Sequence, residues 1–131
     1  MFSNCKNLRF IELPSSVEKI EGDAFAECAL QKIDLPENIN TIESYAFSEC
    51  DSLTFVTIPP KVTSINSGTF YSCDFLEKVN IHDEVKYIAN DAFDRCDKLT
   101  ICGIKGSYAE QYANEHNIPF EELDATIEFL N

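Results

Sequence analysis

Cysteine recurs along this chain at an almost constant interval, and this regularity constrains the fold more than any other feature. Successive members of the series are separated by 23, 22, 23 and 23 residues: Cys5, Cys28, Cys50, Cys73 and Cys96. From Cys28 onward, each cysteine follows a phenylalanine by three positions. A fixed period of this length predicts a solenoid, in which one short unit is copied and stacked.

The rest of the unit repeats with the same period. A leucine follows each cysteine. After this leucine come two aliphatic residues with one residue between them, and then usually a proline. Two further aliphatic residues, three positions apart, complete the unit. The unit reads C-x-x-L-x-x-I-x-L-P-x-x-V-x-x-I-x-x-x-A-F-x-x, and the second copy is one residue shorter between Cys28 and Leu30. Since such a unit cannot bury its own apolar side chains, stacked copies must share one core. About four and a half repeats of 22–23 residues are therefore expected, with neighbouring turns about 4.8 Å apart along parallel strands.

Stacking turns every inward position into a ladder of like residues. One predicted ladder is Leu8, Leu30, Leu53, Leu76 and Leu99, and another is Phe2, Phe25, Phe47, Phe70 and Phe93. The L-x-x-I-x-L-P and A-F-x-x-C runs resemble the leucine-rich repeat proteins, most closely the BspA-like class, over residues 2 to about 120. The asparagine that ordinary leucine-rich repeats carry after the strand is missing, as in this subclass. The resemblance implies a right-handed β-rich coil belonging to a surface or secreted protein, often adhesive and often one domain of a longer chain.

The two ends of the array differ. Residues 2–5 match the end of a repeat, so the chain begins inside a unit, and solenoids need capped ends. We expect either a fragment of a longer array or an open end that packs on a partner, which includes self-association. At the other end, Ser107 and Glu110 have capping-box spacing for a helix over about 108–116, which Asn117 would close, with a last strand at 118–120. The predicted domains are a solenoid over 1–120, with its helical cap at about 100–120, and an acidic tail over 121–131, where a short amphipathic helix is one expectation.

The cysteines allow three interpretations. Structural zinc sites need close pairs such as C-x-x-C, and only Cys96 and Cys102 come near each other, without partners. Disulfides need converging side chains with a dihedral angle of about 90°, whereas residues in a ladder point in parallel. We therefore favour small buried hydrophobic residues. Counted from Cys96, Cys102 falls at the inward position that Ile11 occupies in the first repeat.

Other catalytic or ligand-binding patterns are weak. His82 replaces the proline of the repeat and His116 lies near the end of the predicted helix, so neither is expected beside a nucleophile. A calcium site at Asp91, Asp94 and Asp97 is conceivable, but solvated loop carboxylates are the simpler interpretation. The chain has four glycines and no glycine-rich phosphate loop. The sequence predicts no enzyme, no cofactor and no metal.

The net charge of −13 and a pI near 4.3 limit the partners. Such a chain repels nucleic acid and anionic membranes and tolerates basic partners. No apolar stretch approaches the roughly 20 residues that cross a bilayer. Residues 1–5 lack the features of a secretory signal, which argues against export only if residue 1 is the natural start. The sequence leaves the location open, and the family resemblance suggests the cell surface or secretion.

Strand alternation places two columns on the outer, concave face of the sheet. The first is Phe10, Lys32, Phe55, Lys78 and Ile101, and the second is Glu12, Asp34, Thr57, Asn80 and Gly103. Large apolar side chains exposed together often mark an interface, and the two lysines would add charge complementarity. Two alternatives remain: aromatic and β-branched residues simply suit strands, or the phenylalanines fold inward.

The repeat and the exposed columns predict a protein-interaction module that binds a protein through the concave sheet. The family resemblance implies that it acts in adhesion and that its partner is a host or cell-surface protein. One alternative is a structural spacer or assembly element of a larger repeat protein, joined through its open N-terminal end. Another alternative is a carbohydrate-binding module. An enzyme has no support in the sequence.

Overall fold

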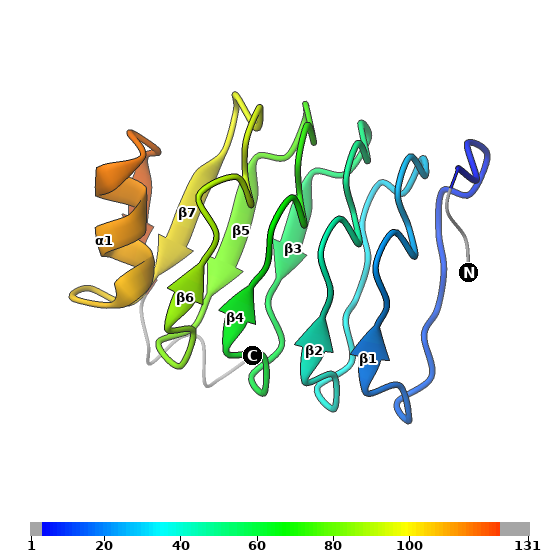
Figure 1. Ribbon diagram of the computed structural model, residues 1–131, viewed down its shortest axis with the longest axis horizontal. Coiled ribbons are helices and arrows are strands. Elements are labelled where there is room, and N and C mark those ends of the chain that lie inside the picture. Colours follow the sequence, from blue (N-terminus) through cyan, green and yellow to red (C-terminus); the bar gives the residue numbers. More distant parts are fainter. Residues whose placement is uncertain (1–3, 124–131) are drawn as a thin grey trace.

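The structure is a computed structural model that describes residues 4–123. The chain forms a β-solenoid of about five turns with one short helix, as the repeat predicts (Figure 1). Phe2, the first residue of the predicted phenylalanine ladder, lies outside the described residues. So does most of the 121–131 segment, for which we expected an amphipathic helix.

One wall of the solenoid is a four-stranded parallel sheet. Its strands, in spatial order, are β3 (Phe55–Thr57), β5 (Lys78–Ile81), β7 (Thr100–Gly103) and β8 (Phe120–Glu122). Each repeat adds one strand beside the preceding one, and Lys32 extends the ladder toward the N-terminus by a single bridge to Phe55. The last strand was expected at 118–120 and begins two residues later.

A second wall is made of very short parallel strands. Here β1 (Lys19–Ile20) pairs with β2 (Thr41–Ile42), and β4 (Ser64–Ile65) pairs with β6 (Tyr87–Ile88). In each strand the isoleucine is buried and the preceding residue is at least partly exposed. This alternation follows the pleat of a strand, and it directs the last aliphatic residue of each repeat into the core.

The A-F-x-x-C segments form a third wall of tight turns. The residue just before the cysteine has a left-handed backbone in every copy, with φ values between 56° and 63°: Asn4, Glu27, Glu49, Ser72 and Arg95. This conformation aims its backbone N–H at the neighbouring turn. Glu49 donates to the carbonyl of Tyr71 at 2.7 Å, and Ser72 donates to that of Asp94 at 2.8 Å. The turns are thus hydrogen-bonded to one another on this side as well.

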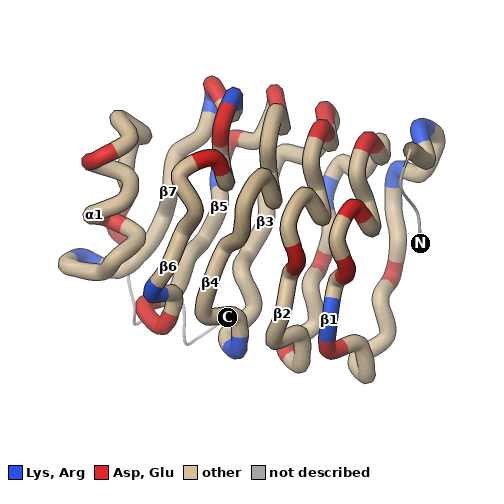
Figure 2. Tube along the Cα trace, viewed as in Figure 1, with Lys and Arg blue, Asp and Glu red and all other residues tan. Residues whose placement is uncertain are grey.

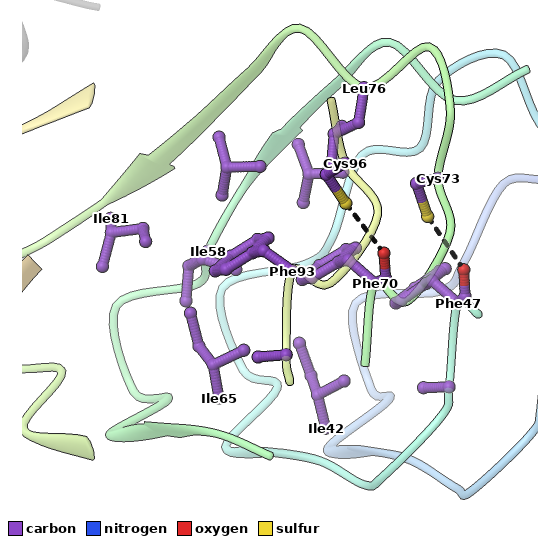
Figure 3. Packing of buried hydrophobic residues seen from close by; sticks show 14 of the residues in the cluster. Ile42, Phe47, Ile58, Ile65, Phe70, Cys73, Leu76, Ile81, Phe93 and Cys96 are labelled. Carbon is purple, nitrogen blue, oxygen red and sulfur yellow. Dashed lines mark hydrogen bonds between the residues drawn. The ribbon is translucent and has the colours of Figure 1, made fainter. Parts of the chain in front are cut away.

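The core is built from the predicted ladders, which are confirmed within the described residues. Phe25, Phe47, Phe70 and Phe93 stack with ring centroids 5.4–5.6 Å apart and planes within 11° of parallel. Figure 3 shows the last three of these rings. The repeated leucines are buried from the second copy onward, while Leu8 in the first copy is half-buried.

The repeated cysteines are buried from Cys28 onward, as the third interpretation predicts, and within residues 4–123 no cysteine forms a disulfide. Each of the last three also donates a hydrogen bond to a phenylalanine carbonyl in the preceding turn: Cys50 to Phe25, Cys73 to Phe47 and Cys96 to Phe70, with Sγ–O distances of 3.1, 3.2 and 3.0 Å. Figure 3 shows the last two of these hydrogen bonds. Each of these carbonyls also accepts from the backbone N–H of the cysteine in its own turn. The thiol therefore fills a small space and adds a second hydrogen bond to a buried carbonyl. Burial raises the pKa of Cys50 to about 12.

Helix α1 (Tyr108–Glu115) closes the C-terminal end of the core. The Ser107 hydroxyl accepts from the N–H of Glu110, as predicted. In a capping box the glutamate would accept from the N–H of Ser107. Here the Glu110 carboxylate accepts from the N–H of Gly106, one residue earlier. Tyr112 packs edge-on against Phe93, with ring centroids 6.3 Å apart. Its hydroxyl donates to the carbonyl of Ala89 at 2.9 Å, so this residue ends the phenylalanine stack without leaving a buried polar group unpaired.

Candidate interaction surface

We call the outer surface of the four-stranded sheet, together with the corresponding residues of the first two turns, the sheet face. Strand register places Phe55 between Lys32 and Lys78, as predicted for the first column. Phe55 is 43% exposed and Phe10 is 61% exposed, so neither folds inward. Both lysines are also exposed. Four of the five residues predicted for this column therefore present their side chains to solvent.

The prediction that Ile101 belongs to this column was wrong. Ile101 pairs with Val79 on the inward side and is 0% exposed. The fifth copy has one residue between Leu99 and its next inward aliphatic residue, where the other copies have two. Because strand side chains alternate with a period of two, losing one residue moves Ile101 into the core. Thr100 takes the place beside Lys78.

The second column lies next to the first. Glu12, Asp34 and Thr57 are exposed, whereas Asn80 is partly buried and donates from Nδ2 to Thr57 Oγ1 at 3.3 Å. Beyond Asn80, strand register continues the column through Cys102 to Glu121. The prediction of Gly103 at this place was wrong, since Gly103 pairs with the inward Ile81. The expectation that Cys102 points inward was therefore also wrong, for the same reason as at Ile101. Cys102 is buried, but it stands apart from the continuous apolar core.

Three further aromatic side chains are exposed outside the two predicted columns: Tyr45, Phe75 and Tyr87. Phe75 precedes Leu76 at the edge of the sheet face, and the ammonium of Lys98 lies 4.3 Å from its ring centroid. Tyr87 lies on β6, in the second wall. The position just before the repeated leucine is a surface position in each copy, and this signal could have identified Phe75.

A groove of about 430 Å³ lies beside the second column, between the first and second turns. Its apolar lining comes from Ile11, Leu13, Leu35 and Pro36, and its charged lining from Glu12 and Asp34. Two other hollows are more polar. One, of about 290 Å³, lies between the last turn and α1, and the other, of about 320 Å³, is lined by acidic turn residues.

The remaining candidates form structural contacts. His82 Nε2 lies 2.8 Å from the carbonyl of Pro59, and its Nδ1 accepts from the N–H of Glu84. His116 Nδ1 lies 2.9 Å from the carbonyl of Tyr112. The carboxylate of Asp91 accepts from Ser67 and Gly68 in the preceding turn. Within residues 4–123, no three histidines, cysteines or carboxylates gather in a way that would hold a metal ion.

Charge is distributed unevenly over the surface. Carboxylates mark the tips of successive turns along the upper edge in Figure 2. Burial, with the negative charges of Asp74 and Glu27, raises the pKa of Asp51 at this edge. In the part of the chain that the structure describes, no helix has the length and apolarity needed to cross a membrane.

The repeat, the stacked core and the parallel register agree with one known family. Six copies of the BspA type leucine rich repeat region match residues 1–100. This chain belongs to the BspA-type leucine-rich repeat family. No curated protein matches it.

Solved structures of bacterial leucine-rich repeat proteins share the fold. A leucine rich cell surface protein from Faecalibacterium prausnitzii is 25% identical with a TM-score of 0.62, over 84% of this chain and 35% of that one. A leucine rich repeat protein from T. pallidum is 25% identical with a TM-score of 0.66, over 89% of this chain and 63% of that one. The pneumococcal vaccine antigen PcpA, 19% identical, has a TM-score of 0.77 over 95% of this chain and 32% of its own. The match thus spans less than two thirds of each of these relatives.

Proposed function

We propose that this chain is a recognition module that binds a protein partner through the sheet face, and that it acts in adhesion at a cell surface. The observation that carries the proposal is the exposure of Phe10 and Phe55 on either side of Lys32, on the flat wall of an otherwise acidic solenoid. The description of the Faecalibacterium relative as a cell surface protein supports the location.

The scaffold suits recognition because its backbone is fixed before binding. Phe55 lies in β3, whose backbone is paired with β5, so its position is set by the ladder. A partner therefore has to order only two aromatic side chains and their neighbouring lysines, which limits the entropy lost on binding. Fully burying a phenylalanine side chain contributes about 1.5–3 kcal/mol, so two partly exposed rings are sufficient anchors for a moderate affinity.

A protein partner fits this surface better than a carbohydrate. Phenylalanine offers an apolar ring without the hydroxyl or N–H that tyrosine and tryptophan supply to a polar ligand. Phe10 and Phe55 are accompanied by lysines and carboxylates, a mixture that matches the apolar centre and charged rim of protein interfaces.

The test begins with peptides selected against the purified chain from a random library displayed on phage. Their affinities are then measured for the wild type, for Phe10→Ser/Phe55→Ser, and for Tyr87→Ser. Tyr87 is a matched control because it is 54% exposed but lies on β6, in another wall. Loss of two aromatic anchors is expected to weaken binding about tenfold or more, while the control changes it less than about twofold. Equal affinities for both variants would contradict the proposal.

A further inference from the structure

The groove between the first two turns exists because these turns are less closely joined than the later ones. Leu13 and Leu35 are half-buried, whereas the residues at the same position in the next two copies, Ile58 and Ile81, are 2% and 0% exposed. In the described structure, a single backbone hydrogen bond, from Gln31 to the carbonyl of Arg9, joins residues 9–14 to residues 31–36. The aliphatic side chains at the ends of these segments therefore remain open to solvent.

The rim of the groove is negatively charged. Glu12 and Asp34 are both exposed, and they occupy equivalent positions in adjacent turns, which lie about 4.8 Å apart in such a ladder. The two ion pairs within residues 4–123 are Lys19–Glu43 and Lys78–Glu121, so neither rim carboxylate is paired. Lys32 stands two residues before Asp34 and forms an ion pair with neither of them.

Apolar walls beside unpaired carboxylates define what can bind. A negatively charged segment would be repelled by the rim and by the net charge of −13. A purely aliphatic segment would bury Leu13 and Leu35 but would leave the two carboxylates partly desolvated and unpaired, which is costly. A segment with an aliphatic side chain next to a lysine or arginine satisfies both parts of the groove.

We propose that the groove binds such a pair, an aliphatic residue followed by a lysine or arginine in an extended peptide. The partner segment recognised at this end of the sheet face is therefore basic and aliphatic. This inference rests on the proposed function, since it identifies the chemistry of the protein partner.

The test uses amide chemical shifts of the full 131-residue chain. The probe is Ac-Leu-Lys-NH2 and its matched control is Ac-Leu-Glu-NH2, both blocked so that terminal charges do not contribute. The lysine peptide is expected to shift the backbone amides of the non-proline residues in the groove segments, 11–15 and 34–36, with a dissociation constant on the order of 1 mM. The glutamate peptide is expected to bind at least about fivefold more weakly.

Two carboxamide variants separate local pairing from net charge. Glu12→Gln/Asp34→Asn should abolish the preference for lysine. Asp83→Asn/Glu84→Gln makes the same change in charge at two exposed residues of another turn, so it should retain the preference. Shifts that fall outside the groove, equal binding of the two peptides, or equal effects of the two variants would each overturn the inference.

The same measurements separate this inference from the proposed function. If the selected phage peptides depend on Phe10 and Phe55 but the lysine dipeptide does not bind, the groove assignment fails and sheet-face recognition stands. If the dipeptide binds in the groove but the selected peptides ignore both phenylalanines, the groove assignment stands and the proposed sheet-face site fails.

Discussion

The ammonium of Lys78 lies 3.5 Å from the carboxylate of Glu121, although the strands that carry them are not neighbours. Strand β7 runs between β5 and β8, and its Cys102 is in register with Glu121. The ion pair therefore crosses over β7 close to Cys102. This ion pair explains why Cys102 is only 1% exposed although it lies in an outward column.

Removing Glu121 should make the Cys102 thiol reactive. Burial first, and then the charge of Glu121, raise the pKa of Cys102, while Lys78 lowers it. Glu121→Ala uncovers the thiol and lowers its pKa, so more thiolate is present at pH 8 and alkylation by iodoacetamide should accelerate severalfold. Lys78→Ala also uncovers the thiol but removes the group that lowers its pKa, so it should accelerate alkylation less. Peptide mass spectrometry of the alkylated chain measures the rate for each variant. If Cys102 were alkylated at the same rate in Glu121→Ala as in the wild type, the ion pair would not shield this thiol.

The phenylalanine stack should carry much more stability than the exposed phenylalanines. Phe70 is 0% exposed and stacks between Phe47 and Phe93. Phe70→Ala removes a full ring from a packed core and should lower the free energy of unfolding by about 3–5 kcal/mol. Phe55→Ala on the sheet face should cost less than about 1 kcal/mol, because this ring is largely in solvent. Urea unfolding compares the two, and similar costs would contradict the assignment of Phe55 to a binding role.

Much of this architecture could be predicted because the repeat supplies the same evidence several times. The ladders of leucine, phenylalanine and cysteine needed only the period and the principle that stacked units share a core. The helix at Tyr108–Glu115 could be placed because Ser107 and Glu110 have the spacing of a capping pair.

The errors arose where one copy departs from the others. Cys96 and Leu99 are three residues apart, as Cys73 and Leu76 are, so aligning the fifth repeat on either one puts Ile101 on the surface and Cys102 in the core. The observed register instead pairs Ile101 with Val79. The residue missing after Leu99 reverses every side chain in the strand, so only an alignment on the aliphatic residues of the strand itself gives the observed arrangement. The groove beside Leu13 and Leu35 was not predictable, because it reflects how many backbone hydrogen bonds join two particular turns.

The repeated buried cysteines should contribute to stability through both packing and hydrogen bonding. Cys73 is fully buried and donates to the carbonyl of Phe47, which also accepts from the N–H of Cys50, so Cys73→Ala leaves a small cavity and removes one of these two hydrogen bonds. We expect a loss of about 2 kcal/mol in the free energy of unfolding. Cys5→Ala is the matched control: this residue is only half-buried in the first turn, and its replacement should cost less than half as much. Equal losses in thermal or urea unfolding would show that burial in the ladder does not set the contribution of the thiol.

The buried thiols should also make the fold sensitive to alkaline pH. Burial raises the pKa of Cys50 from 9.0 to about 12, and burial likewise raises the pKa of Tyr112. Above pH 9 the unfolded chain releases the Cys50 proton while the folded chain retains it, so ionisation favours the unfolded state. The stabilisation is complete below pH 9 and is lost as the pH rises toward 12, by up to about 1.4 kcal/mol per pH unit for this thiol.

Urea unfolding under reducing conditions at several pH values between 7 and 10.5 tests this dependence. The free energy of unfolding should change little from this cause between pH 7 and 8 and should fall increasingly steeply above pH 9. Cys50→Ala is less stable at neutral pH but lacks this thiol, so its free energy should fall less steeply above pH 9 than that of the wild type. All other ionisable groups are common to both proteins, so their contribution cancels in the difference. Parallel curves for the two proteins would mean that Cys50 ionises as readily in the folded chain as in the unfolded chain, which its burial beneath the neighbouring turns argues against.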